Sequence, residues 1–164
     1  MARIRDTFAA VLLALCAGTT ATAADFDTEV PLTRATSGNF YIEGELNGNV
    51  SASFLVDTGS GLLTVSADLL AELERHGKVT RSGRMAARLA NGRLQAVNLY
   101  RVERFVLGGH CDLGAVEVAV MPGARTNILG LNVLQRAAPF AVHVSPPKLA
   151  LSACGLVAES LAAR

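Results

Sequence analysis

The sequence contains no tryptophan, and aromatic residues make up only 5% of its 164 residues. Hydrophobic residues nevertheless account for 51%, so a core can form, but it must be built from Val, Leu, Ile and Ala. A chain of this length can bury one substantial core. The sequence has no internal repeat, low-complexity tract or linker that would divide it, and it therefore predicts one domain with an aliphatic core.

An excess of charge is also missing, because 15 Lys and Arg nearly balance 14 Asp and Glu. Nucleic-acid-binding proteins carry a basic face, so the balance argues against nucleic-acid partners. No apolar run reaches the roughly 20 residues needed to span a bilayer. We therefore expect no membrane span in the mature chain.

The N-terminus has the order of features typical of a secretory signal peptide. Arg3 and Arg5 give a basic start, residues 8–17 are apolar, and residues 21–23 are small. We predict cleavage after Ala23, with the next bond a close second, and an exported protein that is periplasmic or secreted. An uncleaved anchor or a buried core helix are the alternatives, and the bulky Leu before Cys16 disfavours lipidation.

Cysteine is scarce, with three residues in all. Export removes Cys16 and leaves Cys111 and Cys154. Two cysteines in an oxidising compartment predict one disulfide. An intersubunit bridge and two buried free thiols are the alternatives.

The most informative stretch is residues 54–60, Phe-Leu-Val-Asp-Thr-Gly-Ser. An apolar run bounded by turn residues predicts a buried strand, and a carboxylate such as Asp57 at its end is costly unless chemistry uses it. Gly59 permits a sharp turn or a close approach. The hydroxyls of Thr58 and Ser60 can orient the carboxylate. By itself, Asp-Thr-Gly is also an ordinary turn sequence.

A second stretch, residues 127–134, repeats this order of apolar strand and glycine, here followed by a helix. Together the two stretches resemble the motifs of the retropepsin-like aspartic proteases, and more narrowly their exported, single-domain bacterial members. The matches are Leu-Val-Asp-Thr-Gly-Ser at 55–60 and Ile-Leu-Gly at 128–130. The likeness runs from about residue 40 to about residue 152 in the order of elements.

The resemblance implies an aspartic endopeptidase with a closed β-barrel, one or two short helices and a flap hairpin. Short strands with regularly spaced turn signals independently predict a mainly-β, barrel-like domain. We place the signal peptide at 1–23, the protease domain at 24–154 and a C-terminal tail at 155–164. The implied substrate is a peptide or protein, and no cofactor or metal is expected.

Aspartic-protease chemistry needs two carboxylates that share one proton, one activating a water and the other donating to the scissile carbonyl. The sequence has a single Asp-Thr-Gly motif. The resemblance therefore implies a two-fold homodimer in which Asp57 of each subunit meets at the axis.

The resemblance also implies supporting roles. Thr58 would form hydrogen bonds across the dimer, Gly59 would allow the close approach, and Ser60 would bond the outer carboxylate oxygen. In the second motif, Ile128 and Leu129 would pack beneath the loop, while Gly130 would let its neighbours close in.

Two positions depart from the retroviral members of the family. Those members have an acid two positions after the motif glycine and an arginine directly after the second glycine, and the two side chains pair. Gly61 and Leu131 occupy these positions here. The retroviral way of bracing the dimer is therefore not expected in this chain.

A hairpin is predicted at residues 84–102, because Asn91 and Gly92 form a strong turn signal between two strands at 84–89 and 93–102. It follows Asp57 by about thirty residues, and the family resemblance implies that it is the flap, with Asn91 and Gly92 at the tip. A plain surface hairpin is the alternative.

Turn and cap signals delimit the remaining elements. We expect an edge strand at 29–32, and Ser66 and Gly77 to bound a helix at 67–76. Further strands are expected at 40–46, 50–56, 62–65, 105–107, 116–121, 127–129, 141–144 and 149–152, and a second helix at 130–137.

The same residues allow other functions to be compared with an endopeptidase. A non-catalytic module that binds peptides or partners on the same fold is the main alternative. A metal site is disfavoured because His110, Cys111, His143 and Cys154 show no chelating spacing. A serine nucleophile is disfavoured because no Gly-x-Ser-x-Gly elbow is present.

Overall fold

The computed structural model describes residues 25–77, 79–89 and 91–155. The predicted signal peptide and most of the predicted tail lie outside these residues. The helices are α1 (Ala67–His76), α2 (Leu131–Leu134) and the 3-10 turn η1 (Gln135–Ala137). The strands are β1 (Thr28–Pro31), β2 (Thr33–Arg34), β3 (Phe40–Leu46), β4 (Val50–Val56), β5 (Leu63–Val65), β6 (Val79–Arg88), β7 (Leu94–Val102), β8 (Phe105–Leu107), β9 (Cys111–Asp112), β10 (Val116–Val120), β11 (Asn127–Leu129), β12 (Phe140–Val144) and β13 (Pro147–Leu151).

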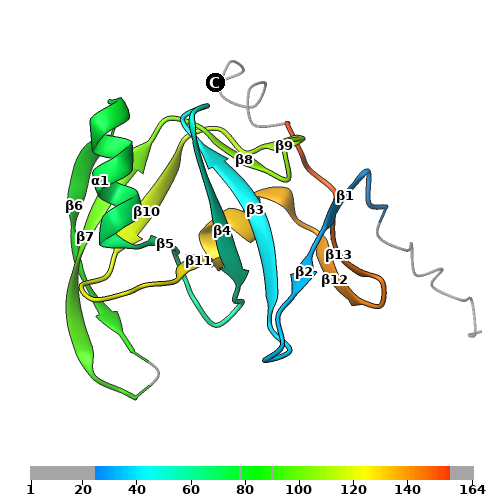
Figure 1. The fold of residues 1–164 in the computed structure, drawn as a ribbon, viewed down its shortest axis with the longest axis horizontal. Helices are drawn as coiled ribbons and strands as arrows, with labels where there is room; N and C mark the ends of the chain where they lie inside the picture. Colours follow the sequence, from blue (N-terminus) through cyan, green and yellow to red (C-terminus); the bar gives the residue numbers. More distant parts are fainter. Residues whose placement is uncertain (1–24, 78, 90, 156–164) are drawn as a thin grey trace, which may run out of the picture.

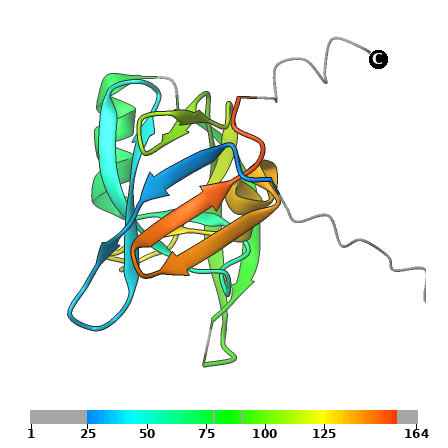
Figure 2. The ribbon, with the colours of Figure 1, turned by 90° about the vertical axis from the view of Figure 1, so that its right-hand side faces the viewer.

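The domain is mainly β, as the sequence predicts, and its strands form two sheets. The larger sheet has the order β6-β7-β10-β5-β11-β4-β3-β8-β9, with β2 added beside β3 (Figure 1). The smaller sheet has the order β1-β13-β12 and is seen face-on in Figure 2. The expected edge strand near the N-terminus is confirmed as β1, which pairs with β13 alone.

The expectation of a closed barrel is wrong, because no sheet among the described residues closes on itself. Closure would require β6 to pair with β9 at the opposite end of the larger sheet. β9 is only two residues long, and β6 is the outer strand of a projecting hairpin whose exposed side chains include Arg84 and Arg88. Short strands and charged side chains are features that keep sheet edges unpaired.

The core lies within the curved larger sheet and is aliphatic, as its composition requires. Its largest buried side chains include Phe54 and Phe105, whose rings meet edge to face with centroids 5.3 Å apart. Helix α1 covers one part of this core with Leu69, Leu70 and Leu73.

Helix α1 begins and ends where its cap signals predict. The Ser66 hydroxyl accepts a hydrogen bond from the Leu69 amide at 3.2 Å, which satisfies one free N–H of the first turn. Gly77 ends the helix with a positive φ of 75°, a conformation that glycine adopts readily.

The hairpin that follows α1 is longer than the sequence predicts. Strand β6 begins at Val79 rather than Arg84, and its pairing with β7 shifts register between Arg81 and Gly83. Such a bulge interrupts the alternation of side chains, so the strand pattern in residues 79–83 cannot be recognised from hydrophobic periodicity.

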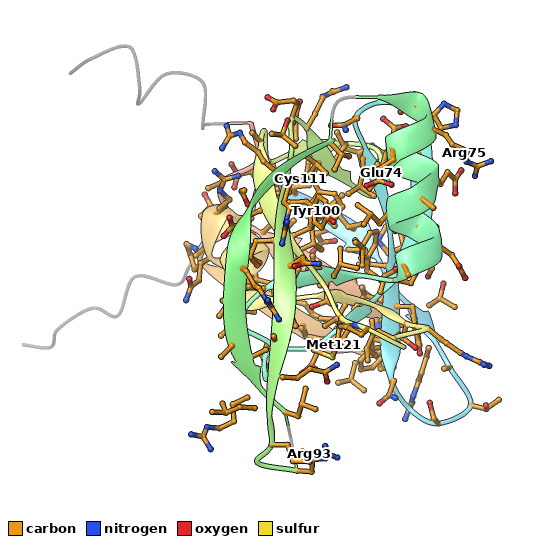
Figure 3. The ribbon with its side chains drawn as sticks, turned by 90° about the vertical axis from the view of Figure 1, so that its left-hand side faces the viewer. Glu74, Arg75, Arg93, Tyr100, Cys111 and Met121 are labelled. Carbon is orange, nitrogen blue, oxygen red and sulfur yellow. A yellow bond between two sulfur atoms is a disulfide. The ribbon has the colours of Figure 1, made fainter. Side chains whose placement is uncertain are left out.

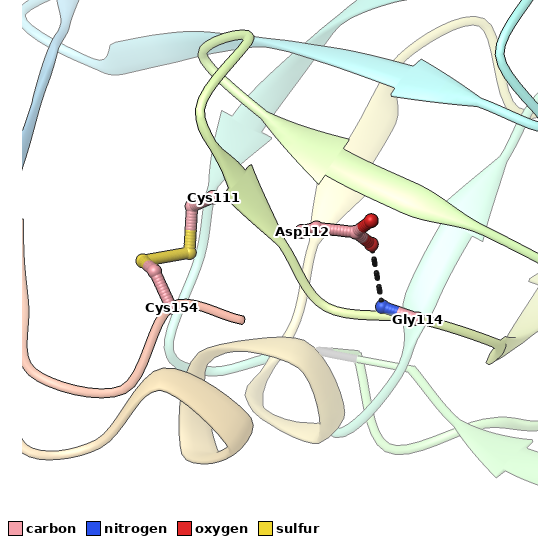
Figure 4. Close-up of a disulfide and its surroundings, with 4 residues drawn as sticks. All are labelled: Cys111, Asp112, Gly114 and Cys154. Atoms are coloured by element: carbon pink, nitrogen blue, oxygen red, sulfur yellow. Dashed lines mark hydrogen bonds between the residues drawn. A yellow bond between two sulfur atoms is a disulfide. The ribbon is translucent and has the colours of Figure 1, made fainter. Parts of the chain in front are cut away.

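The predicted intrachain disulfide between Cys111 and Cys154 is confirmed, and it ties β9 to the segment after β13 (Figure 4). Beside it, Asp112 accepts hydrogen bonds from Gly114 N at 2.9 Å and from Arg104 Nε at 2.7 Å. Burial works to raise the pKa of Asp112, but these two bonds and the charge of Arg104 outweigh it and hold that pKa below its ordinary value. The group therefore supports folding at neutral pH, and this support is lost as the pH falls through the lowered pKa.

Reduction of this disulfide is expected to destabilise the domain strongly. The bridge spans 43 residues, and a loop of that size restricts the unfolded chain by about 4 kcal/mol in the chain-entropy model. Thermal unfolding of the mature protein with and without reductant should differ by at least about 10 °C. A Cys154→Ser variant serves as the control, since it should melt low and be insensitive to reductant. Equal melting of the oxidised and reduced wild type would contradict the intrachain bridge.

Candidate active site

The loop that carries Asp57 connects two strands that are not neighbours. Strand β11 lies between them, paired in parallel with β4 and antiparallel with β5. Since adjacent strands lie about 4.8 Å apart, the ends of β4 and β5 are separated by about 10 Å. Residues 57–62 span this distance beyond the end of β11. Asp57 therefore lies at the end of β4, a strand that is only partly buried, where the chain turns toward β5.

The Asp57 carboxylate is half-buried, and the loop itself fixes its orientation. Its Oδ1 accepts a hydrogen bond from the Gly59 amide at 2.8 Å. A Cβ at Gly59 would lie 3.0 Å from that oxygen, so a side chain there would push against the carboxylate. The backbone amide of Asp57 donates to the Leu129 carbonyl at 3.2 Å. Thr58 is exposed next to the acid.

Ser60 makes a different contact from the one expected. Its hydroxyl donates to the Leu62 carbonyl at 2.9 Å instead of bonding the carboxylate, and the Thr64 hydroxyl donates to the same carbonyl at 3.3 Å. Both bonds close the turn that leads into β5. The Ser60 hydroxyl therefore shapes the loop, while the Ser60 backbone amide donates to the Asp57 carbonyl at 3.2 Å.

The second motif holds the loop from behind. A Cβ at Gly130 would lie 2.3 Å from the carbonyl oxygen of Leu62 and 2.4 Å from its carbonyl carbon. Because both atoms belong to the backbone, they cannot move aside as a flexible side chain could. Only glycine permits this approach. Before it, Leu129 is fully buried and Ile128 pairs with both Leu55 and Thr64.

The start of helix α2 completes this support. The amide of Leu131 donates to the Ser60 carbonyl at 2.8 Å, and the amide of Asn132 donates to the Gly61 carbonyl at 3.1 Å. The first amides of a helix have no partner within it. Here they bind the carbonyls of the acid-bearing loop.

Two asparagines outside the predicted site residues strengthen the same region. The Asn132 side chain accepts from the Leu63 amide at 2.6 Å and donates to the Glu117 carbonyl at 2.9 Å. Asn127 accepts from the Ser66 amide at 2.9 Å. An asparagine at the start of a helix and another in a short strand are recognisable signals, but their partners lie far away in the sequence.

A cavity of about 210 Å³ lies between the loop and the hairpin of β6 and β7. It is lined by Gly59, Ser60, Gly61, Leu62, Thr64, Met85, Ala86, Ala87, Arg88, Val97, Ala119 and Met121. Figure 3 shows Arg93 at the free end of this hairpin. The predicted flap tip, Asn91 and Gly92, belongs to a turn closed by a hydrogen bond from the Gly92 amide to the Leu89 carbonyl at 2.8 Å.

The family model described as "gag-polyprotein putative aspartyl protease" matches residues 42–136. The chain belongs to the retropepsin-like aspartic protease family. Its fold is similar to that in the crystal structure of a retropepsin-like aspartic protease from Rickettsia conorii, with a TM-score of 0.55 and 17% identity over 78% of this chain and 95% of that chain. No curated protein matches the chain.

In this retropepsin-like domain the residues considered for a metal site do not form one. The sulfurs of Cys111 and Cys154 are bonded to each other, and His143 lies on β12 in the smaller sheet. Within the described ranges, no group of three His, Cys, Asp or Glu side chains is placed to hold a metal ion.

Replacing Asn132 with alanine is expected to destabilise the domain by about 2 kcal/mol, since it leaves the Leu63 amide and the Glu117 carbonyl without their partner. Asn98→Ala is the matched control, because the bond from Arg81 to Asn98 lies at the surface and its loss should change stability by less than about 0.5 kcal/mol. Urea unfolding of the three proteins measures both effects. Equal stabilities of the two variants would show that Asn132 does not brace the loop.

Proposed function

We propose that the protein is an aspartic endopeptidase that hydrolyses peptide bonds with a dyad formed by Asp57 of two subunits. The observation that carries this proposal is the placement of Asp57. Its carboxylate is oriented by the Gly59 amide, on a loop that is braced by β11 and α2 beside a partly apolar cavity. A carboxylate held in one orientation at a cavity is suited to proton transfer.

In the proposed reaction the two carboxylates share one proton. The ionised Asp57 takes a proton from a water, whose oxygen attacks the scissile carbonyl carbon. The protonated Asp57 of the other subunit donates its proton to the carbonyl oxygen. The tetrahedral intermediate then collapses. The first Asp57 gives the proton that it took from water to the leaving nitrogen, the C–N bond breaks, and one hydroxyl of the intermediate returns a proton to the other Asp57. The products are a carboxylic acid and an amine.

The homodimer is proposed because the sequence supplies one Asp-Thr-Gly motif per chain. A two-fold axis would bring the same residue of each subunit together. Exposure of Thr58 next to the half-buried acid leaves its hydroxyl accessible to a partner. The hairpin that borders the cavity is proposed as the flap that covers bound peptide, with Asn91 and Gly92 at its tip.

A non-catalytic module that binds peptides is the second candidate. Gly61 and Leu131 favour it, since they replace the ion pair that braces retroviral members. Against it stands the set of backbone bonds from α2 to the loop, which supports the loop without charged side chains. Dependence of catalysis on Asp57 separates the two functions.

Export to an oxidising compartment is proposed together with cleavage after Ala23. The Cys111–Cys154 disulfide supports it, because such bonds persist mainly outside the cytosol. Within the described residues, no helix is both long and apolar enough to cross a membrane. N-terminal sequencing of the exported protein tests the proposal, which expects Ala24 as the first residue and would fail on an intact Met1.

An Asp57→Asn variant is expected to lose cleavage of a mixed peptide library by at least about a thousandfold, because the carboxylate that activates water is gone. The asparagine oxygen can still accept from the Gly59 amide, so the loop should keep its shape. Turnover would be measured by mass spectrometry from about pH 3 to 8. At low enzyme concentration the wild-type rate should rise more than in proportion to protein.

Asp68→Asn is the control for this experiment, since Asp68 is an exposed residue in the first turn of α1. It should cleave the library at the wild-type rate. Activity that survives in the Asp57→Asn variant would contradict the mechanism. Binding of peptides by the wild type without any cleavage would favour the second candidate.

A further inference from the structure

The net charge of the chain is close to zero, but its basic and acidic residues are unevenly distributed along the sequence. Residues 75–102 contain seven of the 15 Lys and Arg and none of the 14 Asp and Glu. The remainder of the chain therefore carries eight cations and 14 acids. Most of the basic segment is the β6–β7 hairpin that borders the cavity.

Arg88 is the residue that connects this charge to the cavity. It is the single charged side chain among the described residues that line the cavity. The other large side chains in the lining are apolar and include Met85, Val97 and Met121. A ligand that enters this cavity therefore meets an apolar surface with one cation.

The hydrogen bonds of Arg88 leave it able to bind an anion. One terminal nitrogen donates to the Gly92 carbonyl at 3.3 Å, which links the side chain to the hairpin turn. A guanidinium has five N–H donors, and a carboxylate can accept two of them at once. Arg84 lies four residues before it on the same strand, and Arg93 lies at the free end of the hairpin (Figure 3).

Other arginines of the hairpin already have partners. Arg81 donates to Asn98 at 2.9 Å, and Arg101 lies 3.7 Å from Glu103. The part of the hairpin that contacts the cavity has no acidic side chain, since Glu74 and Glu103 are the nearest acids in sequence on either side. The hairpin itself thus carries a net positive charge.

We infer that the protein selects polypeptides in which an acidic residue stands close to an apolar residue near the cleaved bond, and that Arg88 determines this specificity. The apolar side chain occupies the cavity, and the carboxylate binds the Arg88 guanidinium. Arg84 and Arg93 attract acidic segments over a longer range. This inference rests on the proposed peptidase function.

An anionic membrane surface could also attract a basic hairpin. The position of Arg88 favours a peptide instead, because a cation at an apolar cavity beside the Asp57 loop fits a single side chain better than a flat surface. Membrane binding is therefore included as an outcome of the test that would overturn the inference.

The test compares matched peptides built on a cleavage site identified from a peptide library. Each position beside the cleaved bond is occupied in turn by Glu, Gln or Lys. At the position that faces Arg88, the wild type should cleave the Glu peptide about three- to fivefold faster in kcat/KM than the Gln peptide, which is the range of a solvent-accessible ion pair. The Lys peptide should be cleaved most slowly.

Substitutions at position 88 test whether Arg88 causes the preference for the Glu peptide. Arg88→Gln should bring the Glu-to-Gln ratio close to one, and Arg88→Glu should make Lys the preferred residue. Arg75→Gln is the matched control, because Arg75 belongs to the same basic segment but lies on α1, at the opposite end of the molecule from Arg93 (Figure 3). It should keep the wild-type ratio.

The preference should also depend on salt and pH. It should weaken as ionic strength rises, because salt screens exposed charges. It should disappear as the pH falls below about 4.3, where the peptide Glu side chain becomes protonated. If Arg88 had only a structural role, the preference for the Glu peptide would not weaken with salt, and Arg88→Gln would not remove its dependence on salt and pH.

Each result has a distinct meaning. Asp57-dependent cleavage with equal rates for Glu and Gln peptides, or an unchanged ratio in Arg88→Gln, would overturn the inference and leave the proposed function standing. Absence of any Asp57-dependent cleavage would overturn both. If Arg88→Gln instead keeps the ratio and loses binding to phosphatidylglycerol vesicles, the hairpin is a membrane contact and the inference fails.

Discussion

The site depends on the close approach of Gly130 to the backbone of Leu62. A side chain at position 130 would overlap the Leu62 carbonyl, so the absence of a Cβ decides whether the second motif can lie behind the acid-bearing loop. From this position, α2 donates its first free amides to the carbonyls of Ser60 and Gly61. The loop is thus held by backbone hydrogen bonds, in a chain that lacks the ion pair of its retroviral relatives.

This support explains how the acid at the end of β4 is held in place. With the loop fixed, the Gly59 amide can orient the Asp57 carboxylate, and the hairpin can enclose a cavity next to it. The cavity also lies beside β6, which is the open edge of the larger sheet. Strand β6 borders the cavity instead of closing a barrel, and this leaves its Arg84 and Arg88 side chains exposed.

Local signals in the sequence predicted the elements that depend on neighbouring residues. The strand at 50–56 and the helix at 67–76 have the predicted bounds. The turn at Asn47 and Gly48, which both have positive φ, leads into the strand, and Ser66 and Gly77 bound the helix. Contacts between distant segments were not predictable in this way. The bulge that lengthens β6 breaks the alternating pattern, and the partners of Asn132 become apparent only when β5, β10 and α2 are placed together.

The central claim is that two copies of Asp57 act as one catalytic dyad, and mixing subunits tests it most directly. Wild-type protein would be mixed with increasing amounts of the Asp57→Asn variant at a fixed wild-type concentration. The account predicts that cleavage falls as the variant is added, because each mixed dimer holds one carboxylate. A cleavage rate that stays constant under a large excess of the variant would show that a single chain is sufficient and would contradict the dimeric dyad.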